Sequence, residues 1–305
     1  MKIVFAGSPE YAVPALEKLI ACNKNVVAVI TQPDKPTGRK RIITPTPVKV
    51  CAQKYGIPVY DFDKIRLHAD EVKAIGADIM ITCAYGQLLT EQILKCFPQG
   101  VWNLHASLLP LHRGASPIQS SILAGETHTG VTVMKTELAL DTGDILLVKR
   151  CETGNLTCGE LSKKLSALSA EAAAEAVEYI EKGNVQLLMQ DGAKATFCKK
   201  IHKEDCKINF CEDAQTVCRK IKAFSPEPAA YCLFNGAQTN IFNAETTAVE
   251  GYKAGEVVFA DKRGIAVQCG SGGVLITELQ PAGGKRMRAS DFANGRKIKA
   301  GDVLD

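Results

Sequence analysis

Short apolar runs alternate with polar stretches of helical character along the first third of the chain. The apolar runs, each about the length of one strand, lie at 2–6, 25–31, 57–60, 78–82 and 101–105. Strands that are apolar throughout are buried on both faces, as in a parallel sheet covered by helices. The pattern therefore predicts a Rossmann-like α/β unit, in which a ligand lies at the carboxyl ends of the strands.

Residues with capping preferences predict where several helices begin and end. Ser8 followed by Pro9 is typical of an N-cap and the first helical position. A further helix is predicted near 47–55. A long Ala-rich helix is predicted over 161–181, with Gly183 as its C-terminal cap.

The hydrophobic period changes from Thr129 onward. The runs GVTVMKTE and DILLVKR predict two strands joined by the turn LALDTGD, residues 138–144. After a helix predicted over 212–224, short glycine-punctuated runs lie at 229–234, 239–244, 255–260, 264–269 and 274–279. Such regular spacing is typical of a small β-barrel or sandwich, and here we expect an OB-like barrel. We therefore predict an α/β domain over 1–190, a polar and basic linker over 191–205, and a β domain over 206–305.

Polar side chains at the end of the strand 101–105 are candidates for chemistry. Asn103 and His105 leave the same side of that strand, and the tight loop Ser107-Leu108-Leu109-Pro110 follows at once. A lone histidine there is most often incidental. Asp141, in the next strand-connecting turn, could orient the imidazole and stabilise its charged form. The spacing leaves open that Asp141 or Asp144 only stabilises the turn.

Such a trio suits attack of an amine on an acyl carbon. An amide or imidazolium N–H can hold the oxygen of a tetrahedral intermediate, and the imidazole can take the amine proton. No serine or cysteine nucleophile is needed if the substrate brings its own amine. Because a nearby carboxylate favours the imidazolium, we expect Asp141 to raise the pKa of His105.

Cysteine usage and the start of the chain bear on location. The chain begins MKIVFAGS, without a cleavable hydrophobic segment, and no apolar run approaches membrane-spanning length. Its 12 cysteines include no CxxC pair, so we expect free thiols in the cytoplasm. One cluster has side chains that could act as metal ligands: Cys198, His202, Cys206 and Cys211. Their spacing is looser than in structural zinc sites, so we expect no metal and interpret them as small buried side chains.

The region from Asn103 to Leu146, NLHASLLPLHRGASPIQSSILAGETHTGVTVMKTELALDTGDIL, resembles folate-dependent formyltransferases. That family transfers a formyl group from 10-formyltetrahydrofolate to an amine. The resemblance implies that Asn103, His105 and Asp141 are the catalytic trio. Asn103 and His105 would polarise the formyl carbonyl, His105 would assist proton removal, and Asp141 would support His105. It also implies that Ser107, Leu108, Leu109 and Pro110 form the folate-site loop.

Two further regions resemble the branch of this family that acts on methionyl initiator tRNA. They are TQPDKPTGRKRIITPTPVK (31–49) and a C-terminal domain with IKAFSPEPAAYC (221–232) and LQPAGGKRMRASDFANG (279–295). The resemblance covers essentially the whole chain and implies formylation of that tRNA for translation initiation. Ala139 and Ala229 stand where the branch commonly has glycine.

The distribution of charge independently favours an RNA partner. The formal net charge is only +4, but 31–50 holds five basic residues against one acid and 283–300 holds six against one. Two basic clusters at opposite ends of the chain could contact a phosphate backbone. The predicted tRNA-binding residues are Arg39, Lys40, Arg41, Lys285, Arg286 and Arg288.

Three other functions each agree with part of the sequence. A nicotinamide-dependent dehydrogenase would fit the fold class, but the first strand is followed by AGSPEY rather than GxGxxG. A non-catalytic RNA-binding module would not need the Asn103, His105 and Asp141 trio. A formyltransferase for a small amine, such as glycinamide ribonucleotide or an amino-sugar nucleotide, is the main alternative. We expect a monomer with no membrane partner.

Overall fold

This computed structural model describes residues 1–38, 41–296 and 298–305, which divide into two compact units. The first consists of Met1–Pro117, His128–Glu152 and Ser162–Cys198, and the second of Ile118–Thr127, Thr153–Leu161 and Lys199–Asp305. Arg39 and Lys40, two of the predicted tRNA-binding residues, lie outside the described residues.

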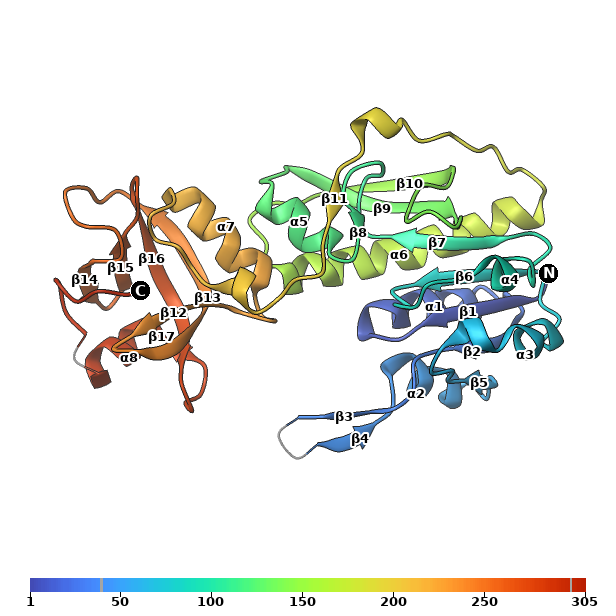
Figure 1. The fold of residues 1–305 in the computed structure, drawn as a ribbon, viewed down its shortest axis with the longest axis horizontal. Coiled ribbons are helices and arrows are strands. Elements are labelled where there is room, and N and C mark those ends of the chain that lie inside the picture. The colour runs from blue at the N-terminus through green and yellow to red at the C-terminus, as the bar shows by residue number, and fades with distance from the viewer. Residues whose placement is uncertain (39–40, 297) are drawn as a thin grey trace. The chain divides into compact units, whose positions relative to one another are not determined.

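The first unit is built on a seven-stranded sheet with the order β10-β9-β7-β6-β1-β2-β5 (Figure 1). Its strands are β1 (Ile3–Gly7), β2 (Val26–Ile30), β5 (Val59–Tyr60), β6 (Ile79–Cys83), β7 (Val101–His105), β9 (His128–Lys135) and β10 (Ile145–Glu152). The strands β1, β2, β5, β6 and β7 pair in parallel, which confirms the predicted α/β class. The strands β9 and β10 pair antiparallel and extend the sheet beyond β7.

Helices cover both faces of this sheet, as the apolar strands require. On one face, Val4, Ile30 and Met80 belong to a buried cluster with residues of η2, α3 and α4. On the other, α6 is joined to η1, directly before α1, by two hydrogen bonds to Tyr11. These elements are η1 (Glu10–Ala12), α1 (Val13–Ala21), α2 (Pro47–Lys54), η2 (Ile65–Leu67), α3 (Ala69–Ala74), α4 (Glu91–Leu94) and α6 (Cys158–Glu181).

Two predicted helix starts differ from the structure. Ser8 is not an N-cap, because its hydroxyl accepts a hydrogen bond from the Gln32 N–H at 3.1 Å and the first helical turn begins at Glu10. The long helix starts at Cys158, three residues earlier than predicted. Thr157 and Glu160 form a capping box there, in which the Glu160 carboxylate accepts from the Thr157 N–H at 2.8 Å.

Short strands flank this sheet. The predicted loop after β2 contains a hairpin of β3 (Lys35–Thr37) and β4 (Ile42–Thr44). A second pair, β8 (Arg113–Gly114) and β11 (Phe197–Cys198), is parallel. It brings the last part of the first unit, which includes η3 (Gly192–Lys194), against the loop that follows β7.

The second unit consists of an antiparallel sheet and several helices. Its sheet runs β12-β13-β16-β15-β14, with β17 paired to β16 (Figure 1). The elements are α5 (Pro117–Leu123), η4 (Glu204–Cys206), α7 (Ala214–Phe224), β12 (Ala230–Phe234), β13 (Ala237–Thr247), β14 (Val257–Asp261), β15 (Gly264–Gln268), β16 (Gly273–Pro281), β17 (Met287–Arg288) and α8 (Ala289–Arg296). The predicted strands and helix of this region are confirmed.

Among the described strands, β12 and β14 do not pair to close a barrel. Instead, Val303 and Leu304 at the end of the chain bridge to Glu256 and Phe234. Ala229, directly before β12, adopts a left-handed φ of 71°. That backbone conformation favours glycine, and this chain has an alanine there. No described helix combines the length and hydropathy needed to cross a membrane.

We predict that Thr46→Ala lowers the free energy of unfolding by about 1 kcal/mol. Thr46 is the N-cap of α2, and its hydroxyl accepts from the Lys49 N–H at 3.2 Å. Thr90→Ala is the matched control, because Thr90 is the N-cap of α4 but makes no capping hydrogen bond. Denaturant titrations of the two variants measure the difference, and equal losses would contradict a capping role for Thr46.

Candidate active site

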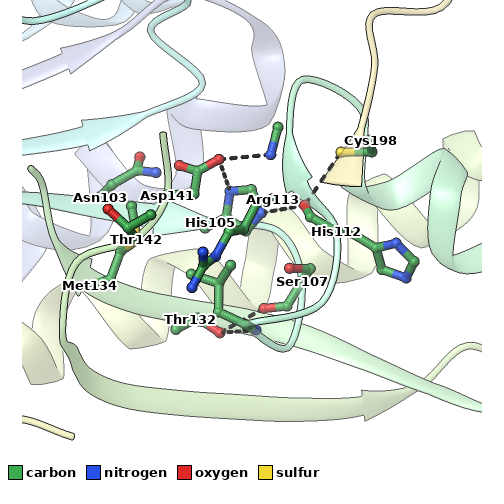
Figure 2. Close-up of polar contacts among 12 residues, drawn as sticks. Asn103, His105, Ser107, His112, Arg113, Thr132, Met134, Asp141, Thr142 and Cys198 are labelled. Atoms are coloured by element: carbon green, nitrogen blue, oxygen red, sulfur yellow. Dashed lines mark hydrogen bonds and ion pairs between the residues drawn. The ribbon is translucent and has the colours of Figure 1, made fainter. Parts of the chain in front are cut away.

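His105 and Asp141, which the sequence singled out, lie together at the end of β7. The His105 Nδ1 is 3.7 Å from Asp141 Oδ2, and only 6% and 10% of the two side chains are exposed. His105 Nε2 lies 2.9 Å from the His112 carbonyl oxygen, and the Gly114 N–H donates to Asp141 Oδ2 at 2.8 Å (Figure 2). The loop after β7 therefore holds both members of the pair.

The His112 carbonyl determines the tautomer of the ring. A carbonyl oxygen only accepts hydrogen bonds, so Nε2 must carry a proton. In the neutral ring Nδ1 then has the lone pair, which faces the Asp141 carboxylate. The two atoms do not hydrogen-bond to one another at 3.7 Å. A substrate N–H group placed between them could donate to both His105 Nδ1 and Asp141 Oδ2.

The expectation that Asp141 raises the pKa of His105 is wrong in its net effect. Burial lowers the pKa of His105 below its usual 6.5, and the attraction of Asp141 only partly opposes this. The cause is desolvation, since a charged ring loses its hydration while the carboxylate stands too far away for a direct hydrogen bond. His105 is therefore neutral near pH 7 and able to accept a proton.

Asn103 lies two residues before His105 on the same side of β7, and Figure 2 places it in the same site. Its Oδ1 accepts a hydrogen bond at 2.8 Å from the hydroxyl of Thr82, at the end of neighbouring β6. This fixes the orientation of the amide and leaves the Nδ2 donors for a substrate oxygen. The carboxyl ends of two parallel strands thus supply a hydrogen-bond donor beside His105.

The turn that carries Asp141 has an unusual backbone. Asp141 itself adopts a left-handed φ of 52°. A side chain at Gly143 would collide with the Lys135 carbonyl, which explains the glycine in LDTGD. The Gln190 side chain donates to the carbonyls of Asp141 and Gly143 at 2.9 and 2.7 Å. Ala139, where the family branch commonly has glycine, is not in a left-handed conformation.

The predicted folate-site loop is held tightly from within. The Ser107 hydroxyl donates to the Leu111 carbonyl at 2.6 Å, and Thr132 Oγ1 donates to the Ser107 carbonyl and accepts from the Leu109 N–H. Ser107 and Leu109 are buried, whereas Leu108 and Pro110 are half-buried. The last two are therefore the members with surface left for a ligand.

The predicted tRNA-binding residues differ in their surroundings. Arg41, Lys285, Arg286 and Arg288 are exposed. Arg286 pairs with Glu278 through two hydrogen bonds of 2.6 Å and stacks on Phe242. Lys49, counted in the first basic cluster, pairs with Asp34 and Asp61. Part of the basic charge is thus neutralised within the chain.

Some residues of this site were not anticipated from the sequence. Arg113 is buried, and the Gln190 side chain accepts from its guanidinium at 2.8 and 3.1 Å. The sequence offered Cys198 as one of four conceivable metal ligands. In the structure its thiol donates to the His112 carbonyl at 3.3 Å (Figure 2). The described residues contain no group of three or more His, Cys, Asp or Glu that could hold a metal ion. The sequence signal that could have pointed to this loop is Gly114, directly after Arg113, which adopts a positive φ of 128°.

A formyl transferase family model matches residues 1–177, and the model of the formyl transferase C-terminal domain matches 200–297. The chain belongs to the formyl transferase family.

Full-length relatives of this formyl transferase are curated as methionyl-tRNA formyltransferases. That of Bacillus velezensis is 41% identical, covering 99% of this chain and 97% of the relative. That of Neisseria meningitidis is 39% identical, covering 100% of both chains. The resemblance inferred from the motifs is thereby confirmed over the whole length.

Solved structures share the fold at low sequence identity. HypX from Aquifex aeolicus in complex with tetrahydrofolic acid has a TM-score of 0.67 at 16% identity, covering 96% of this chain and 46% of HypX. Methionyl-tRNA formyltransferase from Clostridium thermocellum has a TM-score of 0.58 at 16% identity, covering 81% of this chain and 94% of that one.

We predict that Asp141→Asn moves the acid limb of kcat/KM to lower pH. Burial already lowers the pKa of His105 below 6.5, and Asp141 is the largest influence that opposes burial. With His105 acting as a base in its neutral form, as predicted, losing the carboxylate should keep the ring neutral to lower pH, while the maximal rate should fall. Rates of formyl transfer from about pH 5 to 8 measure the limb. A wild-type limb above 6.5 would show that Asp141 outweighs burial.

Proposed function

We propose that this chain transfers the formyl group of 10-formyltetrahydrofolate to the α-amine of methionyl initiator tRNA. One observation carries the chemistry: a buried neutral imidazole directs the lone pair of Nδ1 toward a carboxylate 3.7 Å away. An amine N–H can donate to Nδ1 while a second N–H donates to Asp141. The geometry thus supports an amine as the acceptor.

The reaction proceeds by addition and elimination. The amine nitrogen attacks the formyl carbon, forming a C–N bond, while its proton passes to His105 Nδ1. Asp141 stabilises the resulting imidazolium, and the Asn103 amide donates to the oxygen that gains charge. The bond from the formyl carbon to folate N10 then breaks, and the leaving N10 takes the proton from His105 Nδ1, which returns the ring to its neutral form.

The two substrates are proposed from the relatives and the charge pattern. Full-length relatives at about 40% identity are methionyl-tRNA formyltransferases, and a structural neighbour was solved with tetrahydrofolic acid. We propose that folate contacts the exposed surface of Leu108 and Pro110. We propose that the second unit acts as an OB-like platform for tRNA, with Lys285, Arg286 and Arg288 toward the phosphates and Arg39, Lys40 and Arg41 at the acceptor end.

The proposed cellular setting is the cytoplasm. All 12 cysteines are free thiols, which suits a reducing compartment. We propose that the enzyme acts there as a monomer and uses no metal.

The deciding experiment measures formyl transfer to methionyl initiator tRNA, to methionyl elongator tRNA and to small amines. Preference for the initiator tRNA supports the proposal. Transfer only to glycinamide ribonucleotide or to an amino-sugar nucleotide would replace it with the corresponding small-amine enzyme. Absence of folate-dependent transfer to every acceptor would overturn it.

We predict that His105→Ala, Asn103→Ala and Asp141→Asn each cost about 2–4 kcal/mol of transition-state stabilisation, typical of one acid–base or oxyanion group. Asp144→Asn is the matched control, because Asp144 lies in the same turn and its backbone carbonyl accepts from the Lys135 N–H, while its carboxylate makes no hydrogen bond to another described residue. Single-turnover rates with charged tRNA measure the losses. An inactive Asp144→Asn beside a fully active Asp141→Asn would reverse the assignment of the two aspartates.

We predict that the double variant Lys285→Ala, Arg288→Ala weakens tRNA binding and flattens its salt dependence by roughly one unit of log K against log salt per lost contact. Folate affinity stays unchanged. Arg263→Ala is the control, since Arg263 is an exposed arginine of the same unit already paired with Asp261. Titrations of tRNA across salt test this. A slope equal to that of the wild type would remove the second cluster from the tRNA site.

A further inference from the structure

Gln190 joins two loops of the first unit that are distant in sequence. Its Nε2 donates to the carbonyls of Asp141 and Gly143, at 2.9 and 2.7 Å. Its Oε1 accepts from Nη2 and Nε of Arg113, at 2.8 and 3.1 Å. The side chain thus makes two hydrogen bonds to each loop, and its Nε2 also makes a longer contact of 3.9 Å with Met134 Sδ.

These two loops are the ones that hold the candidate base. The residue before Arg113 provides the carbonyl that accepts from His105 Nε2, and the residue after it, Gly114, donates to the Asp141 carboxylate. The contacts therefore form a closed ring from His105 through the loop to Gln190, then to Asp141 and back to His105. Figure 2 labels four of its members, His105, His112, Arg113 and Asp141.

Only a carboxamide of this length satisfies both sides of the bridge. The buried Arg113 cation needs an acceptor, and two backbone carbonyls need donors. A glutamate would accept from Arg113 but would place an oxygen against the two carbonyls. An alanine would serve neither loop.

The backbone conformation of Asp141 depends on contacts from outside its turn. Its left-handed backbone is disfavoured for a residue with a side chain and persists only where neighbouring contacts enforce it. Within the turn, the Thr142 hydroxyl bonds to Ala139, not to Asp141. The Gln190 amide is bonded to the carbonyl of Asp141 itself.

We propose that Gln190 is a positioning residue for formyl transfer, holding the turn of Asp141 and the loop of His112 and Gly114 at the spacing that lets His105 and Asp141 receive the amine together. The role rests on the proposed function for its substrate. Gln190 does not touch the reacting atoms; it acts through Asp141.

The test compares Gln190→Ala and Gln190→Glu with the wild type, each alone and combined with Asp141→Asn. Each single variant should lower kcat about 10- to 100-fold, the loss typical of a misplaced catalytic group, with KM for folate and tRNA little changed. In the Asp141→Asn background neither change should lower kcat further, because the group that Gln190 positions is already lost.

Gln268→Ala is the matched control. Gln268 lies in the second unit and also donates its Nε2 to two backbone carbonyls, each at 2.8 Å. Its loss should lower the melting temperature without changing kcat. Gln190→Glu keeps the acceptor for Arg113, so it gives a folded variant should Gln190→Ala unfold.

Three outcomes overturn the role of Gln190: an unchanged kcat, a rise in KM with kcat intact, or losses that multiply in full with that of Asp141→Asn. A wild-type enzyme that formylates a different amine refutes the tRNA proposal alone. The same comparison then tests Gln190 with that amine.

Discussion

His105 is an ionisable ring held out of water, and its surroundings favour the neutral form, which can accept a proton. Burial opposes the charged form, the His112 carbonyl fixes the proton on Nε2, and Asp141 stands close enough to stabilise a charge that appears later. A direct ion pair would favour the imidazolium before substrate arrives. The separation of 3.7 Å leaves the lone pair of Nδ1 available. Asp141 is thus placed to stabilise an imidazolium once His105 accepts a proton, while burial keeps the resting ring neutral.

Much of the first unit can be understood as support for this arrangement. The parallel strands bring Asn103 and His105 to one edge of the sheet beside Thr82, and the antiparallel pair β9 and β10 brings Asp141 back to that edge. The segment before β11 then returns to the loop after β7. There the N–H groups of His112 and Arg113 donate to Thr196, each at 2.8 Å. Three separate stretches of chain therefore converge on one histidine.

The two units differ in what they offer a substrate. The first contains the candidate base and the predicted folate-site loop, in which Ser107 and Leu109 make the hydrogen bonds that hold the loop in shape. The second is an antiparallel sheet with exposed basic residues near β17. Internal pairing of Arg286 and Lys49 shows that formal charge counts overstate the free basic surface. Exposed and less constrained groups such as Lys285 and Arg288 are better candidates for phosphate contacts.

The sequence by itself determined the order and type of the long strands and the main helices, because apolar periodicity and capping residues act locally, whereas short elements such as β3, β4, β8 and β11 were not predicted. It also singled out Asn103, His105 and Asp141, since a strand end and an Asp-Gly turn are visible as motifs. Tertiary structure decided what local patterns do not encode. The Ser8 hydroxyl bonds across to the end of β2 instead of capping a helix, and the net pKa shift of His105 follows from burial. Arg113 and Gln190, 77 residues apart, meet only because the chain returns over the loop after β7. Desolvation and hydrogen bonding between distant segments depend on which groups the fold brings together, and no short stretch of sequence contains that information.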